Sequence, residues 1–178
     1  LGWRFSNPKL KAAHGNDSMG MTAENLRDLA AVEAANTSRE EQDRFALQST
    51  QRALAATDSG RFKNEIMPVE IPQRRAEPII FDVDERPRRG STIDKLSKLR
   101  PAFKEGGSVT AANSSGINDG AGALVLATAA AAEKAGLKPR ARILGYAHAG
   151  VRPEVMGIGP VPAVQNLLAK TGLKASDF

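Results

Sequence analysis

The chain of 178 residues contains no cysteine. This absence excludes disulfides, thiolate metal sites and a cysteine nucleophile within these residues. No run approaches the roughly 18 consecutive apolar residues of a membrane span, and the start lacks the charged and apolar regions of a secretory signal. Aromatic residues make up only 4% of the chain. We therefore expect a soluble, unexported protein.

Several catalytic and metal-binding patterns are also missing. The two histidines, His14 and His148, are 134 positions apart, and neither has carboxylates at the spacing of a helical metal site. No Gly-x-Ser-x-Gly elbow or Gly-x4-Gly-Lys-Ser/Thr loop occurs. Gly116, Gly120 and Gly122 precede an expected strand, which is the wrong order for a dinucleotide-binding loop. We expect no metal site, and we interpret the histidines as surface or packing residues.

The length fits one ordinary domain, and the content of 41% hydrophobic and 25% charged residues is close to globular averages. Residues 1–21 have no sustained period and are expected to be irregular. A first helix is predicted from about Thr22 to Val32, and the capping box at Ser38 predicts the start of a second. Gly60 supplies its stop. The second helix should bury one stripe of residues, namely Phe45, Ser49, Ala53 and Ala56.

The rest of the chain predicts alternating strands and helices. Two short runs, 65–71 and 78–83, are interrupted by proline and indicate edge strands or a hairpin. Ser91 or Thr92 should cap a short helix that ends before Pro101. The last third predicts, in order, a buried strand over 121–127, a helix over 129–135 closed by Gly136, a strand over 140–149 and a helix over 161–171 closed by Gly172. This order indicates an α/β architecture.

Positive charge is concentrated in the middle of the chain, which has a net charge of +5. Only one acid, Asp94, lies in the 19 residues that carry this basic run, which consists of Arg86, Arg88, Arg89, Lys95, Lys98, Arg100 and Lys104. Such a run is often a solvated face. A phosphate-binding site is the alternative, and the composition does not choose between them. Nucleic-acid binding has little support because Phe103 is the only aromatic residue nearby.

Residues 110–120 combine small side chains with hydroxyls and amides. Side chains of this size let the backbone approach a strand or a ligand closely. The wider stretch 108–121 resembles the thiolase family, the acetyl-CoA C-acetyltransferases and 3-ketoacyl-CoA thiolases. Further stretches match the family in the same order, namely 19–25, 38–43, 60–66, 98–103 and 150–160. The opening residues 2–8, together with Ser18, are most similar to degradative thiolases of the 3-oxoadipyl-CoA type.

The resemblance implies a thiolase-like α/β fold of which this chain covers the middle. Residues 1–117 would form most of the inserted loop domain, 118–138 the return into the N-terminal half, and 139–178 the start of the C-terminal half. The nucleophilic cysteine of the family would precede Leu1. Its Asn-Glu-Ala-Phe motif, Gly-His-Pro histidine and second cysteine would follow Phe178. The chain itself is thus expected to contain no catalytic residue.

The resemblance further implies that this chain binds coenzyme A (CoA) as a substrate of 3-ketoacyl-CoA cleavage or of the reverse condensation, with no bound cofactor. Arg88, Lys95, Leu96 and Leu99 match positions at the nucleotide end of CoA, although the family has a serine or similar small residue where this chain has Lys95. The residues that match the pantetheine channel or another CoA contact are Ala111, Ser115, Ile117 and, less securely, Leu10. Ser18 and Met19 match the stretch beside the acyl pocket.

Family membership would also imply a cytoplasmic homo-oligomer, a tetramer or dimer, that acts in fatty acid or aromatic catabolism and binds neither nucleic acid nor membrane. One alternative stays open. A module without catalysis could use the basic run to bind CoA, a nucleotide or nucleic acid.

Overall fold

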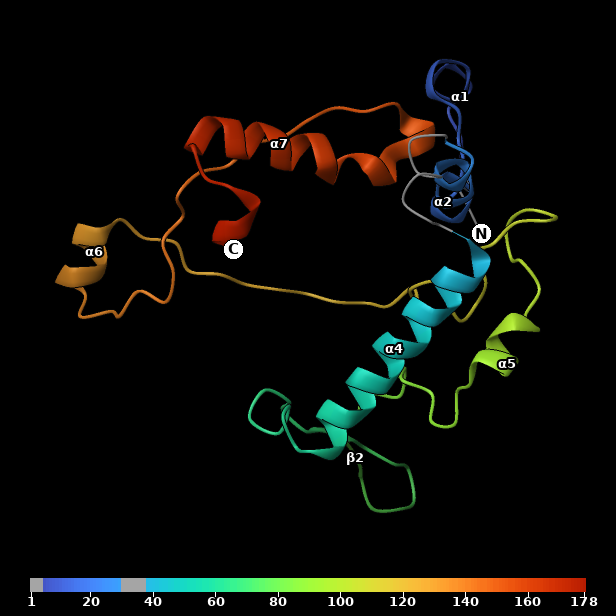
Figure 1. The fold of residues 1–178 in the computed structure, drawn as a ribbon. Coiled ribbons are helices and arrows are strands. Elements are labelled where there is room, and N and C mark those ends of the chain that lie inside the picture. The colour runs from blue at the N-terminus through green and yellow to red at the C-terminus, as the bar shows by residue number, and fades with distance from the viewer. Residues whose placement is uncertain (1–4, 30–37) are drawn as a thin grey trace. The chain divides into compact units, whose positions relative to one another are not determined.

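The computed structural model describes residues 5–29 and 38–178. The chain divides into two compact units, one made of Leu1–Leu26 with Ile117–Phe178 and the other of Arg27–Gly116. Figure 1 shows the elements along the chain. None of the helices among the described residues is long and apolar enough to cross a membrane. The two units are taken separately below.

Helix α4, Arg39–Asp58, is the longest element of the Arg27–Gly116 unit. Ser38 caps it by accepting a hydrogen bond from the Glu41 amide (3.2 Å), as the capping box predicts. Gly60 follows the helix with φ of +72°, the left-handed conformation expected of a helix stop. The expected buried stripe is wrong at Phe45, whose side chain is 75% exposed, and at Ser49, which is also exposed.

The burial on α4 lies on a different face from the one predicted. Asp43 is the buried residue of this helix, and Ala53 and Ala56 are only partly buried. The predicted stripe followed the spacing of apolar residues, which led to Phe45. That criterion does not identify a buried carboxylate, because such a group is buried through its hydrogen-bonding partners. The helix therefore packs through a polar face at its first turns.

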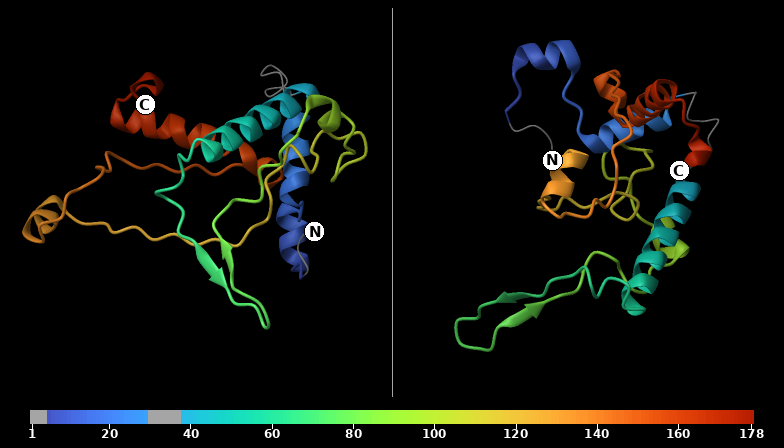
Figure 2. Two further views of the ribbon diagram at one scale, coloured as in Figure 1. Left: turned by 90° about the horizontal axis from the view of Figure 1, so that it is seen from below. Right: turned by 90° about the vertical axis from the view of Figure 1, so that its left-hand side faces the viewer.

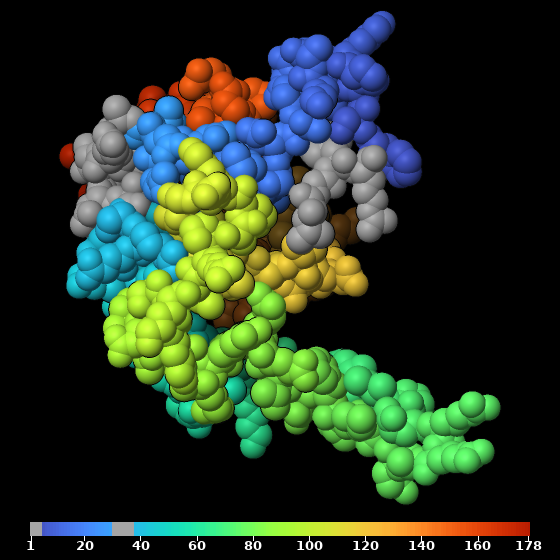
Figure 3. All heavy atoms as spheres, turned by 90° about the vertical axis from the view of Figure 1, so that its right-hand side faces the viewer, coloured from blue at the N-terminus to red at the C-terminus, as the bar shows by residue number. Residues whose placement is uncertain are grey.

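Two strands, β1 (Val69–Ile71) and β2 (Ile79–Phe81), form an antiparallel hairpin. Val69 pairs with Phe81 and Ile71 with Ile79. This confirms the expected hairpin, although the strands are shorter than the predicted runs. All six strand residues are exposed, and Figure 3 shows the hairpin region, in green, extending away from the yellow-green residues of its unit.

Helix α5 spans Ile93–Ser97 and follows the basic turn. Thr92 caps it by accepting a hydrogen bond from the Lys95 amide (3.4 Å), which settles the choice between Ser91 and Thr92. The helix ends before Pro101, as expected. Leu96 is its buried residue.

The other unit begins with helices α1, Pro8–His14, and α2, Met19–Arg27. The expectation of an irregular start is wrong for α1, because Asn7 caps the helix, Pro8 occupies its first turn and Gly15 follows it with φ of +69°. Helix α2 begins three residues before the expected Thr22. It ends at Arg27, and Asp28 and Leu29 are no longer helical, so the expected continuation is wrong there; residues 30–32 of the expected helix lie outside the described residues.

The last third contains the two predicted helices, α6 (Ala129–Lys134) and α7 (Pro160–Thr171). Gly136 and Gly172 follow them with φ of +63° and +72°, as predicted for their stops. The expected strands over 121–127 and 140–149 are wrong: both segments are extended but have no ladder, and Figure 2 shows them without arrows. A strand is defined by a hydrogen-bonded neighbour, and no described segment pairs with either.

Two short 3-10 helices complete this unit, η1 (Pro153–Ile158) and η2 (Ala175–Asp177). The side-chain amide of Asn25 on α2 donates to the carbonyl of Glu154 in η1 (3.0 Å). Helix α7 lies against the extended segment near Tyr146, whose ring is 4.4 Å from the Lys170 ammonium. These contacts join α2 to η1 and α7 to the extended segment before it.

Candidate functional site

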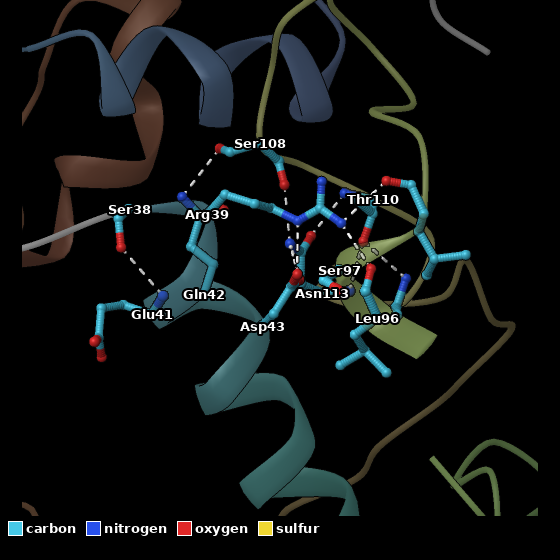
Figure 4. Close-up of polar contacts among 12 residues, drawn as sticks. Ser38, Arg39, Glu41, Gln42, Asp43, Leu96, Ser97, Ser108, Thr110 and Asn113 are labelled. Carbon is cyan, nitrogen blue, oxygen red and sulfur yellow. Dashed lines mark hydrogen bonds and ion pairs between the residues drawn. The ribbon is translucent and has the colours of Figure 1, made fainter. Parts of the chain in front are cut away.

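A buried carboxylate organises the Arg27–Gly116 unit. The Asp43 side chain lies in the second turn of α4 and the residue is only 1% exposed. Its two oxygens accept from the Arg39 Nε (2.7 Å) and from the Asn113 Nδ2 (3.0 Å), as Figure 4 shows. Both partners are needed because a buried carboxylate is stable only when its oxygens are paired. Asp43 therefore ties helix α4 to the segment around Asn113.

The Arg39 guanidinium extends the network to helix α5. Its Nη2 donates to the carbonyls of Leu96 (2.7 Å) and Leu99 (3.0 Å), at and just beyond the end of that helix. Carbonyls at a helix end lack partners within the helix, so an arginine fork is a suitable donor for them. The side chain of Arg39 is 25% exposed. One guanidinium thus joins α4 to α5.

The segment 108–116 is held by its own side chains. The Asn113 Oδ1 accepts from the Thr110 amide (2.7 Å) while its Nδ2 also donates to the Ser108 carbonyl (2.9 Å). The Ser114 hydroxyl donates to the Thr110 carbonyl (2.6 Å), and the Gln42 amide of α4 donates to the Ser108 hydroxyl (3.0 Å). These bonds hold a turn in which Ser108 and Thr110 are almost fully buried.

Six of the predicted CoA residues lie in this unit. Five of them are on the two segments that the network holds, α5 with the residues just after it and 108–116, and the sixth is on the turn before α5. The three expected on or next to α5 are Lys95, Leu96 and Leu99; Lys95 and Leu99 are exposed, and Leu96 is buried. The Lys95 ammonium donates to the Gly90 carbonyl (2.7 Å). In the second segment, Ala111 and Ser115 are exposed. The sixth, Arg88, precedes α5 on the surface.

The basic run is not uniformly available for an anion. Arg89 pairs with Asp58 at the end of α4, with nitrogen to oxygen distances of 2.5 and 3.0 Å. This hydrogen bond lowers the pKa of the Asp58 carboxyl and raises that of Arg89. Lys104 pairs with Asp28 (2.6 Å). The hydrogen bond from Lys104 lowers the pKa of the Asp28 carboxyl most, and the hydrogen bond from Arg27 lowers it further.

Arg88 differs from its neighbour. Its backbone carbonyl accepts from the Ser91 hydroxyl (2.8 Å), but its guanidinium has no hydrogen bond or ion pair with any residue that the structure describes. The fork of Arg88 is therefore free to bind an anion, unlike that of Arg89. Arg86 is placed otherwise, because a Cβ on Gly116 would collide with its guanidinium. Glycine at 116 lets Arg86 lie directly on that backbone.

The remaining predicted residues belong to the other unit. Ser18 immediately precedes α2, and its hydroxyl accepts from the Met21 amide (3.3 Å), while the Met19 side chain is exposed. Leu10 lies on α1 and is partly exposed, and Ile117 is exposed. The structure does not bring these four residues together with the six above in one unit. Their assignment to a CoA site stays a prediction.

The polar network contains the residues that sequence reasoning missed, Arg39, Asp43 and Asn113. For Arg39 and Asp43 the stretch 38–43 carried a signal. The capping box there accounts for Ser38 and Glu41, but the spacing of Arg39 and Asp43 was not considered. Four positions separate these two, which places an arginine and a carboxylate side by side on a helix. Within the part of the chain that the structure describes, no group of three or more metal-ligating side chains occurs.

Two family models match the chain in sequence order. The model of the thiolase N-terminal domain matches residues 5–130, and that of the thiolase C-terminal domain matches residues 137–178. The chain is 50% identical over its whole length to a beta-ketoadipyl-CoA thiolase of Pseudomonas putida, of which it covers 43%. It is 53% identical over 86% of its length to an acetyl-CoA acetyltransferase of Pseudomonas aeruginosa, of which that match covers 38%.

Solved structures agree with these relatives. An acetyl-CoA acetyltransferase of Bacillus anthracis superposes with a TM-score of 0.79 at 48% identity, over 91% of this chain and 40% of that one. Human mitochondrial 3-ketoacyl-CoA thiolase in complex with CoA superposes with a TM-score of 0.76 at 46% identity, over 90% of this chain and 38% of that one. The chain spans less than half the length of the relatives that it matches.

Proposed function

The chain belongs to the thiolase family and has the thiolase fold, and on that premise we propose that it supplies the CoA-binding part of an acyl-CoA C-acyltransferase. The observation that carries the proposal is the match of both thiolase models in order along the chain, with 50% identity over all 178 residues to a relative named for this chemistry. The predicted domain limits, 1–117, 118–138 and 139–178, form part of the proposal.

The reaction is thiolytic cleavage of a 3-ketoacyl-CoA or the reverse condensation. A cysteine thiolate attacks the 3-keto carbon, the bond between C2 and C3 breaks, and acetyl-CoA leaves after its C2 takes a proton. The acyl group, now a thioester of the cysteine, then passes to the sulfur of a second CoA and the cysteine is released. Because these 178 residues contain no cysteine, the nucleophile must come from sequence outside them.

The contribution of this chain is the positioning of CoA, a substrate, with no other cofactor. The free guanidinium of Arg88 suits the phosphates of the nucleotide end. Lys95 follows seven positions later, on α5. The small exposed residues Ala111 and Ser115 suit the narrow pantetheine arm. Holding the thioester in place can supply a large part of the rate acceleration of such an enzyme.

The other proposed residues complete the same path. Leu10 and Ile117 would contact CoA, and Ser18 and Met19 would lie beside the acyl group. The relatives named beta-ketoadipyl-CoA thiolase favour a dicarboxylic 3-ketoacyl substrate. We also propose that the enzyme acts in fatty acid or aromatic catabolism in the cytoplasm. We further propose a homo-oligomer, either a dimer or a tetramer.

The test compares Arg88→Ala with Arg89→Ala in the intact protein. We expect Arg88→Ala to raise the Kd for CoA by roughly 10- to 100-fold, since a hydrogen bond to a charged group contributes about 1.5–3 kcal/mol, and to lower thiolysis in parallel. Arg89→Ala is the matched control because its guanidinium already pairs with Asp58. Its effect on the Kd should be several-fold smaller. Isothermal titration and a thiolysis assay measure both quantities.

Three outcomes would contradict the proposal in different ways. An unchanged Kd in Arg88→Ala would remove this residue from the site. CoA binding without any thiolysis in the intact protein would favour the module without catalysis. Binding of DNA with a steep dependence on salt, weakened by Arg88→Ala, would instead indicate a nucleic-acid function for the basic run.

A further inference from the structure

We propose that Arg39 and Asp43 are positioning residues that set the spacing between the two ends of bound CoA. The inference rests on the proposed function, because it concerns the same CoA site. Neither residue is proposed to contact CoA itself: Asp43 is buried, and the Nε and Nη2 of Arg39 already donate to Asp43 and to the carbonyls of Leu96 and Leu99. Their effect must pass through the two segments that they hold.

The first segment is helix α5, which carries the proposed contacts for the nucleotide end. This helix has five residues, too few to be stable without packing. Its side of the contact with α4 includes the carbonyls of Leu96 and Leu99, which both accept from the Arg39 Nη2. Without this donor, the end of α5 that bears Lys95 and Leu99 would lose its charged link to α4.

The second segment is 108–116, which carries the proposed contacts for the pantetheine arm. It is joined to α4 by the bond from Asn113 to Asp43 and by the bond from Gln42 to Ser108. The Asn113 amide uses its oxygen for the Thr110 amide and its nitrogen for Asp43 and the Ser108 carbonyl. Loss of the Asp43 carboxylate would remove one of these two bonds and loosen the turn against the helix.

The consequence is a division of labour that a purely structural network would not have. Arg39 acts on α5 and hence on the nucleotide end, whereas Asp43 is shared by α5, through Arg39, and by the pantetheine segment (Figure 4). A single CoA molecule must contact both segments. A variant of Arg39 should therefore impair a thiol that carries the nucleotide more strongly than one that lacks it.

The experiment uses the intact protein and two acceptor thiols, CoA and pantetheine, with the same acyl donor. In a reaction through an acyl-enzyme, kcat/KM for the acceptor reports only the step in which that thiol binds and reacts. We expect Arg39→Gln to lower kcat/KM for CoA on the order of 10- to 100-fold, as a displaced contact does. The value for pantetheine should fall by a much smaller factor, because Asn113 still donates to the Asp43 carboxylate and holds it to the second segment. Asp43→Asn should lower both values.

Arg44→Gln is the matched control. Arg44 lies on the same helix and pairs with Glu40, four residues before it, but contacts neither segment. It should leave both values unchanged. The same selective loss in Arg44→Gln would overturn the inference, because the effect would then follow the charge of α4. So would an equal loss for both thiols in Arg39→Gln, or no loss.

Folding of every variant is checked by circular dichroism, and for Arg39→Gln the activity retained with pantetheine is a second check. If Arg39→Gln does not fold, Arg39→Lys replaces it; this variant keeps the charge beside Asp43 but cannot bridge to both carbonyls, so its loss should be smaller and still selective for CoA. Equal losses in Arg39→Lys would overturn the inference.

Failure of the proposed function is distinguishable. A wild-type protein that transfers an acyl group to neither thiol overturns that function, and this inference with it. A wild-type protein that uses CoA but not pantetheine overturns the premise that residues 108–116 hold the pantetheine arm on their own.

Discussion

Two neighbouring stretches with similar composition behave in opposite ways. Residues 108–116 and 121–127 both consist largely of small, uncharged side chains. In the first, Val109 is 8% exposed and lies between two almost fully buried residues; in the second, Leu124 is 91% exposed. The difference lies in their partners, because the first is bonded to α4 and the second to no described segment.

The comparison shows which kinds of structure this chain forms from its own residues. Turns that satisfy their backbone with their own side chains, such as that of Thr110 and Asn113, are complete within about five residues. A strand needs a neighbour at about 4.8 Å, and that neighbour is a different segment. Local hydrogen bonds therefore order residues 108–116, while the extended stretch is left with exposed leucine and valine.

The largest effect should come from placing a charge in each stretch. In the 178-residue chain, Val109→Asp should lower the free energy of unfolding of the Arg27–Gly116 unit by about 4 kcal/mol or more, since it removes apolar burial and adds an unpaired buried charge. Leu124→Asp should change stability by less than about 0.5 kcal/mol, as an exposed site does. Urea unfolding followed by circular dichroism measures both.

The same pair sharpens the comparison in the intact protein. If residues 121–127 pair there as a central strand of the thiolase fold, Leu124→Asp should become as destabilising as Val109→Asp. Equal effects already in the 178-residue chain would contradict the contrast in burial. A neutral Leu124→Asp in the intact protein would show that no partner covers this stretch.

How much the sequence predicts follows the same division. Helix ends were predictable where a single residue determines them, as Ser38, Thr92, Gly136 and Gly172 do, because a cap or a left-handed glycine acts within one turn. Helix α1 was missed although Asn7 and Pro8 carried the same kind of signal.

What could not be predicted depends on residues far apart in the chain. The expected strands failed because an apolar run does not specify its neighbour. The burial of Asp43 was missed because its partner Asn113 lies 70 positions away, and helical periodicity scores a carboxylate as exposed. For the candidate site, the motif matches indicated the segments that we propose to bind CoA, but not the arginine and carboxylate that hold those segments in place.

A smaller effect should distinguish two helix caps. Ser38→Ala removes the acceptor for the Glu41 amide and should destabilise the Arg27–Gly116 unit by about 1 kcal/mol. Thr128→Ala removes the equivalent acceptor for the Ala131 amide, but α6 lies between two extended segments and belongs to the other unit. Its effect should be confined to α6. Amide hydrogen exchange measures both, and faster exchange across α4 in Thr128→Ala would contradict this separation.

The smallest effect concerns an exposed ion pair of the basic run. Asp58 lies at the C-terminal end of α4, where a carboxylate is unfavourable, and its bond from Arg89 lowers its pKa below the ordinary value of 3.8. A carboxyl whose pKa is lower in the folded state stabilises that state above about pH 3.8, and this contribution disappears as the pH falls through the lowered pKa. Arg89→Gln should therefore raise the pKa of Asp58 to 3.8 or above and remove the contribution. Titration of the carboxyl carbon by NMR measures the change, and Lys104→Gln is its control because it should raise the pKa of Asp28 alone. An unchanged pKa of Asp58 in Arg89→Gln would mean that another group holds this carboxylate, and Arg89 would then be as free to bind an anion as Arg88.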